Sequence, residues 1–116
     1  MKTIVTTYGS FLTGTEIADA VTGYGLALAR VHGVDVVDIP FVASDGSVSR
    51  VDLRIGWLSD MAAVLSDGAD DELVEVDTIL MILSKINYLE GRRGLAFADD
   101  DVEQLRSADL NWDDII

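Results

Sequence analysis

Apolar and polar residues alternate most regularly through residues 51–57, where charged residues and glycine separate four apolar ones. This period of two is typical of a strand with one buried face. The β-branched run at 34–42 predicts a partner strand, and Pro40 within it favours an edge position or a strand end because proline has no backbone N–H. Asp45 and Gly46 tolerate positive φ and predict the turn of a β-hairpin.

A helical period precedes this hairpin. Five apolar residues recur at spacings of 4, 3, 4 and 3, which predicts a helix with one buried face. Thr13 and Glu16 fit a capping box at its start, and Gly33 supplies its end. One strand is predicted before it, over the β-branched and aromatic residues 3–8. The five apolar positions are Ile17, Val21, Tyr24, Leu28 and Val31.

Two glycines, Gly23 and Gly25, lie inside this helix. Each costs about 1 kcal/mol of helix stability relative to alanine. They lie too far into the helix to cradle a phosphate, which in dinucleotide-binding proteins is held by glycines between a strand and a helix. We interpret them as positions where a missing side chain lets the helix lie close to a sheet.

Residues 58–66 fit two structures. Ser59 could cap a short helix, or the apolar residues Met61, Ala63 and Leu65 could line one face of a strand. The alternation favours the strand.

The last part of the chain predicts two helices. One covers 78–90, with Asp77 as its N-cap and Gly91 at its end, and the other covers about 101–108. Together the elements predict an α+β fold in one domain, residues 1–116. Its order is strand, helix, strand, strand with a central hairpin, then a short strand or helix, then two helices packed on a small, mainly antiparallel sheet.

The 78–90 helix is apolar on every side over residues 79–83. Such a helix needs burial on more than one face, which a domain of 116 residues supplies poorly. We therefore expect a homodimer formed through this helix, because two-fold symmetry is the commonest way to bury a surplus apolar face.

Charge restricts the partners of the chain. The sequence holds 21 acidic and 8 basic residues, a net charge of −13. Residues 1–58 carry six acidic and four basic side chains, whereas residues 59–116 carry fifteen and four. A surface of this sign repels nucleic-acid phosphates and anionic lipid, so we expect neither as a partner.

The compartment follows from three further features. No apolar run approaches the roughly 18 residues of a membrane-spanning helix. The N-terminus lacks the apolar segment of a signal peptide, and the sequence has no cysteine, which fits a reducing compartment. We expect a cytoplasmic protein.

The candidate partner-binding residues form two acidic clusters and one basic pair. Both acidic clusters precede apolar segments, so the simplest interpretation is that they stabilise helix N-termini, and partner contact is the functional one. The basic pair lies between two glycines and could grip an anionic group or a partner carboxylate. The candidates are Asp70, Asp71, Glu72, Asp99, Asp100, Asp101, Arg92 and Arg93.

No catalytic or metal-binding pattern stands out. His32 is the only histidine; we place it in the last turn of the first helix, where a cation favours the helix dipole. The chain has no histidine pair for zinc and no loop with EF-hand spacing for calcium. We therefore predict no catalytic residues, no metal and no cofactor. Two carboxylates alone can still hydrolyse a glycoside if their separation suits the reaction.

Three functions fit these observations. We favour a non-catalytic acidic interaction protein that binds a basic partner, as an inhibitor or a nucleic-acid mimic does. The alternative is a small enzyme or small-molecule-binding domain that uses carboxylates at a subunit interface. In a third interpretation the acidity serves solvation in a salt-adapted protein, which the presence of only two lysines, Lys2 and Lys85, supports.

Overall fold

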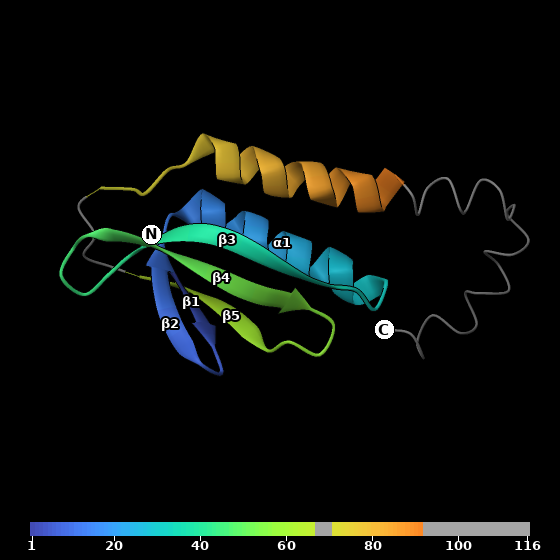
Figure 1. Ribbon diagram of the computed structural model, residues 1–116, viewed down its shortest axis with the longest axis horizontal. Helices are drawn as coiled ribbons and strands as arrows, with labels where there is room; N and C mark the ends of the chain where they lie inside the picture. The colour runs from blue at the N-terminus through green and yellow to red at the C-terminus, as the bar shows by residue number, and fades with distance from the viewer. Residues whose placement is uncertain (67–70, 92–116) are drawn as a thin grey trace, which may run out of the picture.

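The computed structural model describes residues 1–66 and 71–91 (Figure 1). They form a five-stranded antiparallel sheet, the helix α1 (Thr15–Arg30) and a second helix at 76–91, so the predicted α+β class is confirmed. The order across the sheet is β4-β3-β2-β1-β5. The strands are β1 (Lys2–Thr6), β2 (Gly9–Thr13), β3 (Val34–Val42), β4 (Val48–Gly56) and β5 (Met61–Leu65).

A hairpin stands at the start of the chain, so the prediction of one strand over 3–8 is wrong. β1 and β2 pair antiparallel, with Thr6 opposite Gly9 at the turn. Glycine and serine are poor strand formers, which made the start of β2 resemble the end of a strand. Tertiary packing decides here, because the Phe11 ring meets the Phe41 ring edge to face, with 5.3 Å between centroids.

The start of α1 also differs from the prediction. Thr13 is the last residue of β2, and its buried hydroxyl donates to the Pro40 carbonyl oxygen at 2.8 Å. The N-cap residue is Gly14, which offers no side-chain hydrogen bond. The capping box of Thr13 and Glu16 is therefore wrong, and the helix start is bound by a residue from a distant part of the chain, described below.

α1 covers one face of the sheet and forms the core with it. Four of the five stripe residues are buried, and the fifth, Val31, follows the last helical residue and is exposed. Gly25 faces Ile55 of β4 and Met61 of β5, as predicted for a close approach to the sheet, whereas Gly23 faces Ile86 of the second helix. The sheet contributes Ile4, Val37, Ile39, Leu53 and Ile55 to this core.

The predicted central hairpin is confirmed as β3 and β4. In its turn Gly46 has φ +88°, and the Asp45 carboxylate accepts from the Ser47 N–H at 2.9 Å. β2 reaches β3 through a single residue pair, Leu12 and Val42. The edge of β3 that faces β2 is therefore mostly unpaired. An unpaired edge suits Pro40, which has no backbone N–H to donate.

The strand interpretation of residues 58–66 is confirmed by β5, which pairs with β1. The second helix begins at residue 76, earlier than predicted, so Asp77 lies inside its first turn. Glu75 precedes the helix instead: its side chain accepts from the Thr78 hydroxyl, and its carbonyl oxygen accepts from the Ile79 N–H at 3.2 Å. The helix predicted at 101–108 lies outside the described residues.

The second helix lies beside α1 and beside the open edge of β3 (Figure 1). Lys85 of this helix pairs with Asp35 of β3 at 3.1 Å, and the same carboxylate accepts from the Tyr24 hydroxyl of α1 at 2.5 Å. These hydrogen bonds hold the pKa of Asp35 below its usual range. The helix thereby protects a strand edge that would otherwise be free to pair. Neither described helix has the length and hydropathy to cross a membrane.

Candidate functional site

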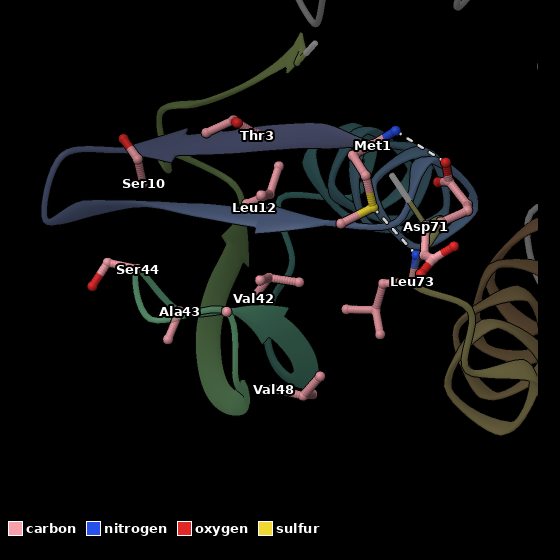
Figure 2. Close-up of a pocket in the computed structure, with 12 residues that line it drawn as sticks. Met1, Thr3, Ser10, Leu12, Val42, Ala43, Ser44, Val48, Asp71 and Leu73 are labelled. Carbon is pink, nitrogen blue, oxygen red and sulfur yellow. Dashed lines mark hydrogen bonds and ion pairs between the residues drawn. The ribbon is translucent and has the colours of Figure 1, made fainter. Parts of the chain in front are cut away.

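A groove of about 900 Å³ opens on the face of the sheet that α1 leaves uncovered (Figure 2). Side chains alternate along a strand, so Thr3 and Leu12 point away from the face that Ile4 shares with α1. The groove lies where the β1–β2 hairpin crosses the start of the β3–β4 turn, and the segment 71–73 closes one side.

The groove combines an apolar surface with hydroxyls and a carboxylate. Ser10 lies on the hairpin side of it and Ser44 on the β3–β4 side, and Asp71 lines it from the closing segment (Figure 2). A surface of this kind suits a ligand with both apolar and hydrogen-bonding groups. The lining residues are Met1, Thr3, Ser10, Leu12, Val42, Ala43, Ser44, Gly46, Val48, Asp71, Glu72 and Leu73.

Glu72 fixes the closing segment to the start of α1. One carboxylate oxygen accepts from the Thr15 N–H, the first backbone donor of the helix, and the other pairs with the Met1 amine at 3.0 Å. The Thr15 N–H and the amine hold the pKa of Glu72 at about 2. A carboxylate in this position satisfies an orphan donor and favours the helix dipole. The Leu73 N–H also contacts the Met1 sulfur at 3.2 Å.

Gly14 is required for this closure. A Cβ atom at this position would lie 1.7 Å from the Leu73 carbonyl oxygen, a distance that no side chain tolerates. The glycine therefore lets the closing segment lie against the helix start, and the wall of the groove depends on it.

Seven of the twelve acidic side chains in the described part of the chain lie at the end where both helices begin. Three partners offset some of this charge: Lys2 pairs with Asp19 at 2.6 Å, Arg50 with Glu75 at 3.0 Å, and the Met1 amine with Glu72. The other four carboxylates are exposed; Asp71 lines the groove, whereas Glu16 lines a second hollow between α1 and the second helix. We call this region the acidic end; it comprises Glu16, Asp19, Asp45, Asp71, Glu72, Glu75 and Asp77.

The opposite end presents apolar and aromatic groups instead. His32 follows α1, rather than lying in its last turn as predicted, and stacks on Trp57 with 4.0 Å between ring centroids. His32 and Leu58 both have positive φ, at 55° and 62°. The Leu58 side chain is 81 % exposed. We call this region, residues 31–34 and 56–59, the Trp57 end.

The sequence-predicted site residues divide into two groups. Asp71 and Glu72 lie together in the wall of the groove. Glu72 binds the start of α1, 57 residues earlier in the chain, and not the N-terminus of the segment that follows its cluster. The sequence analysis did not predict Ser10 and Ser44 as site residues, because isolated serines form no recognisable motif. Asp70, Arg92, Arg93, Asp99, Asp100 and Asp101 lie outside the described residues.

Within residues 1–66 and 71–91, no group of three or more histidine, aspartate or glutamate side chains could hold a metal ion. Comparison with protein-family models, with curated protein sequences and with solved structures returned no match. The chemistry of the site is therefore argued from the groove itself. The apolar floor of the groove can bury apolar groups of a ligand, and the carboxylates near the groove can attract cationic groups of the same ligand.

Proposed function

We propose that this domain is a non-catalytic binding protein whose acidic end receives a cationic segment of a partner protein in the groove. The observation that carries the proposal is a groove of about 900 Å³ with an apolar floor at the most acidic part of the described surface. Asp71 faces the groove, and Asp45 lies in the turn on the other side, between Ser44 and Gly46. A bound chain would therefore pass between two carboxylates.

The state of Glu72 favours binding over carboxylate catalysis. A pair of catalytic carboxyl groups needs one member that accepts or donates a proton near the working pH. Glu72 has both oxygens engaged and a pKa of about 2, so it remains an ionised structural group. Asp71 is then the one carboxylate among the lining residues that is left for a ligand.

The two components of the site have separate roles. Complementary charge raises the association rate and excludes anionic competitors. The apolar floor, which includes Leu12, Val42 and Val48, supplies affinity through burial. The matching partner is a loop or extended strand with lysine or arginine flanking a short apolar run.

The test is a pull-down from cell extract at low ionic strength with three immobilised full-length proteins. One is the wild type, and one carries Asp45→Asn and Asp71→Asn, which remove two charges at the groove. The matched control carries Asp52→Asn and Asp60→Asn, which remove two exposed charges elsewhere. We expect a basic protein that the wild type and the control retain, that the groove variant loses, and that salt releases. Equal retention by all three proteins, or no retention by the wild type, would contradict the proposal.

A further inference from the structure

The second helix exposes apolar residues on an outer face that does not line the groove. Val76 and Leu80 are each 58 % exposed, and Leu83 is 42 % exposed. They follow one another at spacings of four and three, and Asn87 continues the row after four more residues. This is the spacing of the buried seam in a coiled coil, where a single asparagine fixes the register of the helices. We call these four residues the outer stripe.

A hollow runs next to the outer stripe, between the second helix and α1. It has a volume of about 390 Å³, and Ala20 and Gly23 of α1 form part of its wall. A Cβ atom on Gly23 would meet one neighbouring atom, Ile86 Cδ1 at 3.7 Å, so the hollow has room for a side chain. A ridge beside a hollow is self-complementary under two-fold symmetry: each copy places its ridge in the hollow of the other.

Charge selects the direction of such a pair. Both helices run the same way (Figure 1), so their N-termini share the acidic end, while Arg30 lies in the last turn of α1. A parallel pair would bring two acidic ends together. An antiparallel pair brings Arg30 of one copy toward the acidic end of the other. Antiparallel helix dipoles also attract.

We infer that the outer stripe binds a second copy of this chain, antiparallel, with the two-fold axis passing close to Leu83. Leu83 lies at the middle of the 76–91 helix, so this placement overlaps the two helices along nearly their whole length. The surface is separate from the groove, so the dimer leaves the proposed partner site open.

Cysteine cross-linking tests the arrangement cleanly, because the chain contains no cysteine. Leu83→Cys places two thiols at the axis, within the 4–7 Å between Cα atoms that a disulfide spans. Val76→Cys places them at opposite ends of the seam, about 20 Å apart at 1.5 Å per residue. Val64 is an exposed residue of β5, so Val64→Cys is the control for disulfides that form through chance collision of two molecules.

We expect mild oxidation to convert most of the Leu83→Cys protein to a covalent dimer and to leave the other two variants as monomers. Cross-linking of Val76→Cys as efficient as that of Leu83→Cys would show a parallel pair and overturn the inference. A yield for Leu83→Cys no higher than for Val64→Cys would also overturn it.

Light scattering of the unmodified full chain supplies an independent test. We expect a dimer at micromolar concentration, a monomer for Leu80→Glu and a dimer for Val64→Glu. Circular dichroism confirms that the variants fold, since both positions are exposed. A monomeric wild type overturns the inference, including the case in which residues 92–116 of the same chain cover the stripe and shield Leu83→Cys from alkylation.

Discussion

The acidic end and the Trp57 end of the molecule differ in charge and in how their backbones are held. The acidic end carries seven carboxylates against Lys2 and the Met1 amine, with Arg50 reaching in from β4. In the parts of the helices, strands and loops next to the Trp57 end, three basic side chains balance three acidic ones: Arg30, Arg54 and Lys85 against Asp35, Asp60 and Glu90. At the acidic end the residue with positive φ is a glycine, Gly46, whereas two non-glycine residues at the Trp57 end, His32 and Leu58, hold positive φ.

At the acidic end, carboxylates have two roles: some stabilise the fold, and others are available to bind a partner. The helices begin together, so the carboxylates that stabilise helix N-termini gather there, and the same charge surrounds the groove. Glu72 is the structural member of this group, and Asp71 is the member turned toward the groove. At the Trp57 end the exposed Leu58 and the stacked rings contribute no such charge.

The largest effect is expected for Gly14→Ala at the acidic end. The new Cβ would overlap the Leu73 carbonyl oxygen, so the closing segment must leave the helix start, and overpacking of this kind costs about 3 kcal/mol. Urea denaturation of both proteins measures the loss of unfolding free energy. Gly23→Ala is the matched control: its Cβ meets ordinary van der Waals space, so helix propensity raises stability by up to about 1 kcal/mol. Equal effects of the two substitutions would contradict this description of the junction.

A pH-dependent effect is expected for Glu72→Gln. The folded protein holds the pKa of Glu72 at about 2, below its ordinary value of 4.5. A lowered pKa contributes stability that is fully present above the unfolded value and is lost as pH falls toward the folded value. Thermal melts should therefore show wild type more stable than the variant at pH 7, with the gap closing between pH 4.5 and about 2. A gap that stays constant over this range would show that the carboxylate has no such role.

The smallest effect is expected for Leu58→Asn at the Trp57 end. Leucine at positive φ costs about 1 kcal/mol more than asparagine, which tolerates this conformation. The side chain is almost fully exposed, so little burial is lost. The variant should be as stable as wild type or more stable by up to about 1 kcal/mol. A clear loss of stability would mean that Leu58 packs against the fold, and the contrast between the two ends would weaken.

Local periodicity was sufficient to predict the β3–β4 hairpin and the buried face of α1. The turn of this hairpin can be recognised from Asp45 and Gly46, which are adjacent in the sequence. The apolar stripe from Ile17 to Leu28 can be recognised because all its residues lie in one helix. The β1–β2 hairpin was missed because Gly9 owes its strand conformation to pairing and to the packing of neighbouring Phe11.

The site was less predictable because its parts are far apart in the chain. Glu72 lies 57 residues from the helix start that it caps, and no sequence period links the two. The groove exists because β2 and β3 share one residue pair and then diverge, which no pattern within either strand records. The sequence showed charge concentrated in its second half, but three acidic residues of the first half join the acidic end through folding: Glu16, Asp19 and Asp45.

An NMR titration can show whether a cationic chain binds in the groove at the acidic end. The probe is a short peptide with lysines flanking two or three apolar residues, added to ¹⁵N-labelled full-length protein at low ionic strength. We expect the largest amide shifts at four groove residues, Ser10, Leu12, Ser44 and Asp71. We expect much smaller shifts in the protein that carries Asp45→Asn and Asp71→Asn. Shifts centred on Trp57 and Leu58, or the same shifts in the doubly substituted protein, would contradict the proposal.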